Sequence, residues 1–239
     1  MSGAEERLAN DPTSELWGEH RSRYRFAAER LQPGARVLDV ACGAGFGLDI
    51  LQRRVIGLDY DPVTLKHIRG HQLVRGDATC LPFQTGSFDN VVSFETLEHV
   101  RDAAALIAEV RRVLKPAGRL ILSTPNKSFG PLERHTQNPF HIREFTAEEL
   151  RELLRAQFAQ VTLYGQRPSS HYRYVPYLMV EPTRTPDALL WKAQTRLPYG
   201  VKNRFALLTT GRPFYPSERD YCFEPERTDG AHALLAIAE

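Results

Sequence analysis

The chain has 239 residues, of which 42% are hydrophobic and 25% charged, a composition typical of a soluble globular protein with a full core. Its formal net charge is +2 and it has no dense run of lysine or arginine, which argues against nucleic acid and acidic membrane surfaces as partners. The three cysteines are scattered and no apolar run is long enough to cross a membrane, so we expect a cytoplasmic protein without disulfides.

The first segment predicts a helix. Residues 1–10 carry two glutamates and no apolar core, so we expect no signal peptide there. After Asp11-Pro12, a pair typical of a helix start, residues recur at helical spacing up to Gln32-Pro33-Gly34, which ends the helix. We interpret residues 1–33 as an N-terminal helical cap.

A glycine-rich turn follows the first predicted strand, residues 36–40, and organises the rest of the chain. Gly43, Gly45 and Gly47 allow the backbone to turn sharply and to approach a ligand closely. A strand, a glycine turn and a helix in series form the nucleotide pocket of many parallel α/β sheets. The sequence therefore predicts a nucleotide site at the carboxyl end of this strand.

The spacing of the turn indicates which nucleotide. The dinucleotide pattern Gly-x-Gly-x-x-Gly would require a third glycine where Leu48 stands. The carboxylate of Asp39, just ahead of the turn, suits a ligand with a cationic end better than one with phosphates. The turn resembles motif I, Asp-x-Gly-x-Gly-x-Gly, of the class I S-adenosylmethionine-dependent methyltransferases, with Ala41 at the first glycine. Because alanine is nearly as small as glycine, we expect this exchange to be tolerated.

Acidic residues follow the next two predicted strands. The strand at 55–58 ends at Asp59, which matches the family's motif II, and the resemblance implies that its carboxylate accepts both ribose hydroxyls. The strand at 72–75 leads to Asp77, which would accept the adenine amine, while the backbone N–H of Ala78 meets the ring. The cofactor-binding residues that we expect are Tyr24, Asp39, Ala41, Gly43, Gly45, Asp59, Tyr60, Asp77, Ala78 and Phe94.

The fourth predicted strand, residues 90–94, ends where the methyl group meets the acceptor in this family. Glu95, Glu98 and His99 have i, i+3, i+4 spacing, so on a helical turn they would share a face. The segment is similar to the ubiquinone-biosynthesis O-methyltransferases, in which the two glutamates and the histidine are associated with a divalent cation. Two expectations stay open: these residues bind Mg²⁺ or Zn²⁺, or, as in metal-free relatives, His99 serves as a base or hydrogen-bonding cap.

A second base candidate lies further along the chain. A helix over 102–114 and a strand over 119–124 precede a polar loop that holds His135 and His141 at the carboxyl edge of the sheet. We expect His141 to face the acceptor, as the alternative to His99. Thr146 and Glu149 then form a capping box that opens a helix.

A long connection separates the predicted sixth strand, residues 161–164, from the antiparallel seventh, residues 233–238. Residues 166–229 hold 8 of the 16 prolines and 10 of the 23 aromatic residues, whereas a flexible linker would be poor in aromatics. We interpret the segment as an ordered insertion, either a cap that lines the acceptor pocket with aromatic side chains or an arm that packs onto the sheet or forms a homodimer.

The fold we expect is α/β: a Rossmann-like seven-stranded methyltransferase sheet with an antiparallel last strand, an N-terminal helix and a long insertion. Its parts are the cap at 1–33, the cofactor-binding core at 34–165, the insertion at 166–229 and the last strand at 230–239. We expect methyl transfer from S-adenosylmethionine to an oxygen or nitrogen of a small phenolic, sugar or natural-product acceptor, with His99 or His141 removing the proton. The alternatives are a non-catalytic cofactor-binding regulator and an NAD-type oxidoreductase.

Overall fold

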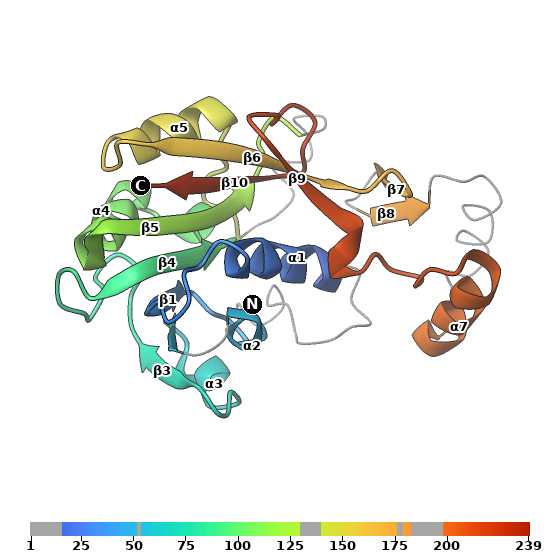
Figure 1. Ribbon diagram of the computed structural model, residues 1–239, viewed down its shortest axis with the longest axis horizontal. Coiled ribbons are helices and arrows are strands. Elements are labelled where there is room, and N and C mark those ends of the chain that lie inside the picture. The colour runs from blue at the N-terminus through green and yellow to red at the C-terminus, as the bar shows by residue number, and fades with distance from the viewer. Residues whose placement is uncertain (1–15, 52–53, 130–139, 176–178, 183–197) are drawn as a thin grey trace. The chain divides into compact units, whose positions relative to one another are not determined.

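The structure is a computed structural model that describes residues 16–51, 54–129, 140–175, 179–182 and 198–239. Its centre is an eight-stranded sheet in the order β3-β2-β1-β4-β5-β10-β6-β9 (Figure 1). The strands are β1 (Val37–Val40), β2 (Val55–Asp59), β3 (Gln72–Arg75), β4 (Phe88–Phe94), β5 (Leu114–Pro125), β6 (Val161–Pro168), β9 (Tyr221–Pro225) and β10 (Ala233–Ala238).

The pairing directions confirm the expected methyltransferase sheet. Strand β1 pairs in parallel with β2 and β4, and the parallel ladder continues to β3 on one side and β5 on the other. Strand β10 lies between β5 and β6 and is antiparallel to both. The eighth strand, β9, was not expected and extends the sheet beyond β6. Since parallel strands present their carboxyl ends at one edge, the segments after β1, β2 and β4 meet there.

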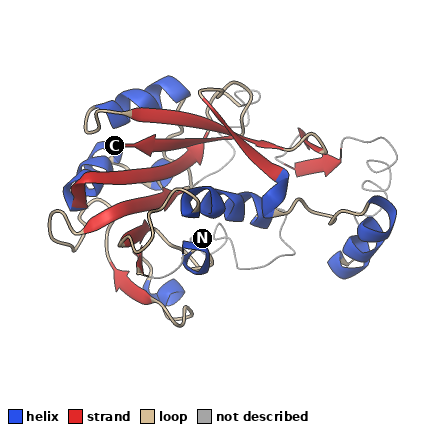
Figure 2. Ribbon diagram, viewed as in Figure 1, coloured by secondary structure: helices blue, strands red, loops and turns tan. Residues whose placement is uncertain are grey.

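Figure 2 shows the helices, and three of the α-helices begin at a side-chain cap. Asp61 accepts the N–H of Val63 at 2.9 Å, and Asp102 accepts that of Ala105 at the same distance. The capping box of Thr146 and Glu149 is present. The helical segments are α1 (Trp17–Ala28), α2 (Leu48–Leu51), α3 (Pro62–Leu65), η1 (Leu97–His99), α4 (Ala103–Val113), α5 (Ala147–Arg155), α7 (Tyr199–Thr210) and η3 (Glu218–Asp220).

The main core lies between the sheet and the apolar faces of α4 and α5. Leu106, Ile107 and Val110 of α4 are buried together with Leu150 and Leu154 of α5, against side chains of β1, β4, β5 and β10. Burying side chains of this size stabilises the fold by about 1.5–3 kcal/mol each. This packing fixes the strands whose ends carry the site.

Two boundaries differ from the expected ones. The segment 115–118, expected as a turn between helix and strand, belongs to β5, because Leu114 already pairs with Phe88 of β4. Helix α1 ends at Ala28, before the expected end at Gln32-Pro33-Gly34, whereas its expected start at 11–12 lies outside the described residues.

The chain divides into two compact units. One contains 23–166 and 223–239, so the second half of α1 belongs with the sheet; the other contains 167–222 and the segment that ends at Ser22. In the second unit, β7 (Tyr172–Val175) and β8 (Met179–Pro182) form an antiparallel pair, and Ser169 donates its N–H to the carbonyl of Asp220 at 2.7 Å. The role of this insertion as a cap or dimer arm stays a prediction. None of the described helices is long and apolar enough to cross a membrane.

Candidate active site

The glycine turn after β1 contains three residues in the left-handed conformation. Gly43 and Gly45 have φ angles of +53° and +77°, as the motif requires, and Ala41 has a φ of +60°. The sequence interpretation treated the exchange of glycine for Ala41 as a matter of size. The structure shows that the backbone conformation matters more than the size of the side chain, because a positive φ destabilises a residue that has a Cβ by about 1 kcal/mol or more.

Asp39 and Tyr24 form a buried pair behind this turn. Asp39 has no exposed surface, and the Tyr24 hydroxyl donates to its Oδ2 at 3.1 Å. Burial, together with the charge of Asp59, raises the pKa of Asp39 to about 8. The Tyr24 ring packs edge-on against Phe94 with centroids 4.8 Å apart. Tyr24 is therefore part of the core, and its expected contact with the cofactor stays a prediction.

Asp59 ties the glycine turn to the start of α3. Its Oδ2 accepts the N–H of Gly43 at 3.0 Å and its Oδ1 accepts that of Asp61 at 2.9 Å. A carboxylate oxygen can accept more than one hydrogen bond, so these bonds are compatible with the expected ribose contact. The next residue, Tyr60, is 68% exposed and offers an aromatic surface beside this carboxylate.

The expected adenine side of the site is held by α4. Asp77 is exposed and accepts the N–H and hydroxyl of Thr79, and these bonds lower the pKa of Asp77. Arg112 donates to the carbonyls of Phe83 and Leu81 at 2.7 and 2.9 Å. The carboxylate of Glu109 accepts the N–H of Leu81 at 2.7 Å.

The two side chains of α4 thus clamp the loop that follows Asp77. The sequence interpretation missed both, because a helix surface residue carries no signal of the loop it will contact.

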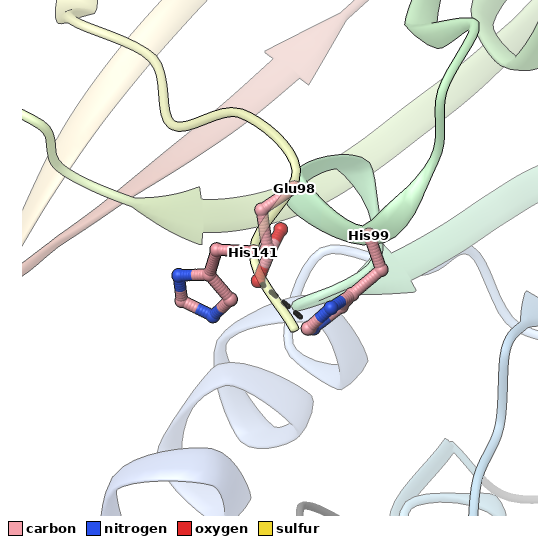
Figure 3. A group of neighbouring side chains, drawn as sticks. All are labelled: Glu98, His99 and His141. Atoms are coloured by element: carbon pink, nitrogen blue, oxygen red, sulfur yellow. Dashed lines mark ion pairs between the residues drawn. The ribbon is translucent and has the colours of Figure 1, made fainter. Parts of the chain in front are cut away.

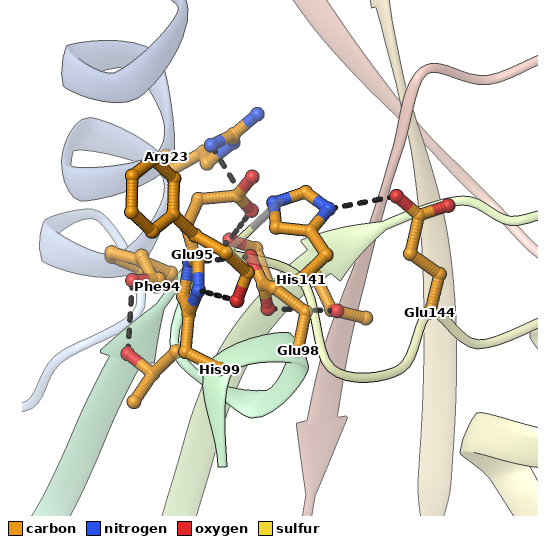
Figure 4. A network of polar contacts seen from close by, with 11 residues as sticks. Arg23, Phe94, Glu95, Glu98, His99, His141 and Glu144 are labelled. Carbon is orange, nitrogen blue, oxygen red and sulfur yellow. Dashed lines mark hydrogen bonds and ion pairs between the residues drawn. The ribbon is translucent and has the colours of Figure 1, made fainter. Parts of the chain in front are cut away.

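Glu95, directly after β4, points away from the segment that follows it (Figure 4). Its φ is +49°, and its Oε1 accepts the Ser123 hydroxyl at 2.7 Å and lies 3.1 Å from Nη1 of Arg23. The expected common helical face of residues 95, 98 and 99 is therefore wrong. The helical turn, η1, begins only at Leu97, and the left-handed residue lies outside it. Glu95 belongs to a network with α1 and β5.

Glu98 is a fully buried carboxyl group beside two imidazoles (Figure 3). Its Oε2 accepts the Thr124 hydroxyl at 3.0 Å, and its Oε1 has no hydrogen-bond partner among the described residues. That Oε1 lies 3.8 Å from Nε2 of His99. Burial, and secondarily the charge of Glu95, raises the pKa of Glu98 well above its ordinary value.

Both imidazoles are held through Nδ1. His99 Nδ1 lies 3.0 Å from the carbonyl oxygen of Phe140, and His141 Nδ1 lies 2.7 Å from Oε1 of Glu144. Because a carbonyl and a carboxylate only accept hydrogen bonds, we assign the proton to Nδ1 in each ring, which leaves the lone pair of the neutral ring on Nε2. The ring centroids are 5.0 Å apart.

Backbone bonds bring His141 to this place. The N–H groups of Ile142 and Arg143 donate to the carbonyl of Glu98 at 2.7 and 3.3 Å. As a result, ligand atoms of Glu98, His99 and His141 lie within 4.8 Å of one another. His141 takes the place that the sequence interpretation gave to Glu95. His135 lies outside the described residues.

Comparisons with known proteins point to a methyltransferase domain. Residues 38–122 match the family model described as a methyltransferase domain. The chain is 42% identical over 143 residues to a probable S-adenosylmethionine-dependent methyltransferase of Mycolicibacterium smegmatis, covering 56% of this chain and 55% of that protein. It is 37% identical over 133 residues to a ubiquinone biosynthesis O-methyltransferase of Xanthomonas axonopodis pv. citri, covering 50% and 56%. The chain thus spans little more than half the length of these relatives.

Solved structures support the fold. A possible histamine N-methyltransferase from Thermotoga maritima superposes with a TM-score of 0.62 at 19% identity, covering 92% of this chain and 88% of that one. An S-adenosylmethionine-dependent methyltransferase from Archaeoglobus fulgidus gives a TM-score of 0.61 at 18% identity, covering 94% of each chain. The glycine turn, Asp59 and the tip of β4 all lie within the residues that the family model matches. Over residues 38–122 the chain is therefore similar to methyltransferase domains, and its fold is that of S-adenosylmethionine-dependent methyltransferases.

Proposed function

We propose that this protein transfers a methyl group from S-adenosylmethionine to an oxygen or nitrogen of a small-molecule acceptor. The observation that carries the proposal is the position of two groups on paired strands. The glycine turn held by Asp59 follows β1. Glu98 and His99 follow β4, which pairs with β1, and backbone bonds to Glu98 hold His141 beside them. Both segments lie at the edge where parallel strands end, which supports a nucleoside site next to a proton-accepting one.

The chemistry divides between cofactor and protein. When bound, S-adenosylmethionine supplies an electrophilic methyl group on a sulfonium. The residues of this chain hold the nucleoside through Asp59 and Asp77, align the acceptor for an in-line displacement, and remove its proton through His99 or His141. Both imidazoles present Nε2 as the atom that takes a proton in the neutral ring. A hydroxyl or amino group of a phenol, sugar or related metabolite could donate its proton to Nε2 while its oxygen or nitrogen is methylated.

A divalent cation is a second proposal for the same place. The three donor groups within 4.8 Å and the buried Glu98 Oε1 without a hydrogen-bond partner among the described residues fit a cation with mixed nitrogen and oxygen ligands. Glu98, His99 and His141 would hold it, and Glu95 would not, because its carboxylate faces Arg23 and Ser123. Such a cation would polarise an acceptor oxygen and ease loss of its proton.

For the insertion at 166–229 we propose one of two roles: a cap that covers the acceptor, or an arm that joins two copies of the chain. Light scattering on the purified protein, with and without deletion of the insertion, distinguishes the two roles. A dimer that becomes a monomer on deletion supports the arm, whereas an unchanged oligomeric state with altered acceptor affinity supports the cap.

Calorimetric titration with S-adenosylhomocysteine, the demethylated product, tests the main proposal. We expect saturable one-to-one binding, no comparable binding of NAD, and release of S-adenosylhomocysteine on incubation with S-adenosylmethionine and an accepted substrate. Binding of NAD in place of S-adenosylhomocysteine would favour the oxidoreductase alternative. Tight binding without turnover over a broad panel of phenols, sugars and amines would favour the regulator.

A further inference from the structure

His141 and His99 each lie near a carboxyl group, but through different ring atoms: His141 meets Glu144 at Nδ1, whereas Glu98 lies 3.8 Å from Nε2 of His99. Nδ1 of His141 and Oε1 of Glu144 are 2.7 Å apart, and the two side chains are only 13% and 9% exposed. We propose that Glu144 is a positioning residue that orients His141 and makes it, rather than His99, the base of the reaction. This inference rests on the proposed methyl transfer and goes beyond it by choosing between the two histidines and adding the residue that acts through one of them.

The electrostatic surroundings separate the two imidazoles. When His141 gains a proton at Nε2, its positive charge lies against a carboxylate, which stabilises the protonated ring. Nδ1 of His99 donates instead to the neutral carbonyl of Phe140, and the carboxyl group near this ring, that of Glu98, lies 3.8 Å from Nε2, the atom that would have to take the proton. Because Glu144 and His141 are largely shielded from water, their interaction is screened less than a surface pair.

The backbone holds the pair rigidly from both sides. On the N-terminal side, the N–H of Ile142 donates to the carbonyl of Glu98 at 2.7 Å. On the C-terminal side, Phe145 is buried and bridges to Asn126 beyond β5, and its carbonyl accepts the N–H of Lys127. The neighbouring residue Arg143 carries a positive charge. Its guanidinium lies 3.4 Å from the carboxylate of Glu149 and over the Phe145 ring, so it forms an ion pair with a glutamate other than Glu144.

In the proposed step, Nε2 of His141 accepts the proton of the acceptor O–H or N–H. At the same time, the acceptor oxygen or nitrogen forms a bond with the methyl carbon. The carbon–sulfur bond breaks, its electron pair returns to sulfur, and the sulfonium becomes a neutral thioether. The proton on His141 then passes to water. Glu144 stays ionised and only holds the ring in the orientation that points Nε2 at the acceptor.

Nitrogen NMR of the histidine rings tests the placement without any acceptor. In the wild-type protein at high pH we expect neutral His141 with the proton on Nδ1. In Glu144→Ala we expect a shift toward the Nε2–H form, which free imidazole favours. Glu144→Gln keeps an accepting oxygen and should retain the Nδ1–H form. Glu148→Gln serves as the matched control, because it removes the carboxylate of a nearby exposed residue. An Nε2–H ring in the wild type, or no change in Glu144→Ala, overturns the proposal.

Turnover of catechol as a probe acceptor tests the consequence. We expect kcat to fall about 10- to 100-fold in Glu144→Ala, as for other residues that orient a functional histidine, with KM for S-adenosylmethionine unchanged. Glu144→Gln should fall between this variant and the wild type, because it keeps the orientation and loses the charge. An unchanged kcat in Glu144→Ala overturns the proposal. If the wild type does not bind S-adenosylhomocysteine, the proposed function is wrong, but the NMR result on the orientation of His141 by Glu144 remains valid.

Discussion

Arg23 of α1 and Glu95 at the tip of β4 form an ion pair with 3.1 Å between Nη1 and Oε1, and only 1% of the arginine side chain is exposed. The pair joins the second half of α1 to the carboxyl edge of the sheet. Ser123 of β5 donates to the same glutamate oxygen, and Gln166 accepts from Nε of Arg23 at 2.6 Å. This network holds Glu95 at a φ of +49°, and strain of this kind at a strand tip is typical of functional sites.

The network predicts different costs for two small substitutions of Glu95. Glu95→Ala removes the carboxylate that pairs with Nη1 of the buried Arg23. We expect a loss of about 2–3 kcal/mol in the free energy of unfolding, at the low end for a buried pair because Glu95 is itself 20% exposed. Glu95→Gly removes the same carboxylate but tolerates the positive φ, so it should be about 1 kcal/mol more stable than Glu95→Ala. Urea unfolding of the two variants measures the difference. An alanine variant as stable as the glycine variant would contradict the left-handed backbone at this position.

A stabilising substitution is expected at the glycine turn. Ala41→Gly should stabilise the protein by about 0.5–1 kcal/mol, because the φ of +60° is strained for alanine and relaxed for glycine. Ala44→Gly, three residues further in the same turn, is the matched control: its φ is not positive, so glycine there should be neutral or destabilising. Chemical denaturation of both variants against the wild type checks the sign, and equal effects at the two positions would refute the explanation.

The buried Asp39 predicts a pH dependence of stability. Its pKa is raised from an ordinary 3.8 to about 8, so between these values the folded protein keeps a proton that the unfolded chain has lost. Stability should therefore fall as the pH rises from about 4 toward about 8, by at most about 1.4 kcal/mol per pH unit from this group. Asp39→Asn keeps an oxygen for the Tyr24 hydroxyl and removes the titration.

Urea unfolding midpoints at pH 5, 6, 7 and 8 for the wild type and Asp39→Asn measure the contribution of Asp39 titration to stability. The difference between the two curves isolates Asp39, because Glu98, whose pKa is also raised, is present in both proteins. We expect the variant to gain stability relative to the wild type with increasing pH. Parallel curves would show that Asp39 does not titrate in this range.

Asp59 should contribute strongly to cofactor affinity. If its carboxylate accepts both ribose hydroxyls, Asp59→Ala should weaken S-adenosylhomocysteine binding about 100-fold, the effect of two hydrogen bonds to a charged acceptor. Asp61→Ala is the control, because it removes the cap of α3 while Asp59 keeps its bond to Gly43. Calorimetry on folded samples gives the affinities. Wild-type affinity in Asp59→Ala would refute the ribose assignment.

The cation proposal separates two neighbouring glutamates. Titration of the metal-free protein with Zn²⁺ or Mg²⁺ should release heat, and Glu98→Gln should reduce the affinity about 10-fold or more by removing one ligand charge. Glu95→Gln should bind as the wild type does, because that residue faces Arg23. Absence of heat in the wild type would end the proposal, and loss of binding in Glu95→Gln would return Glu95 to the ligand set.

Local features of the sequence were sufficient for the framework of this protein. The short apolar runs predicted the strands of the methyltransferase sheet except β9, Thr146 and Glu149 marked a helix start, and the glycine spacing indicated the cofactor class. These predictions succeeded because a strand period, a cap and a turn depend on residues within a few positions of one another. The ribose contact of Asp59, inferred from its place at a strand end, stays a prediction.

Tertiary structure decided the composition of the acceptor side. A positive φ turns Glu95 toward Arg23, which is 72 positions earlier, and backbone bonds to Glu98 bring His141 beside His99 across 42 positions. Spacing along one helical turn cannot encode either event, since both depend on hydrogen bonds between segments that meet only after the sheet has formed. For the same reason, the contact of Glu144 with His141 and the α4 clamp of Glu109 and Arg112 exist only in the fold.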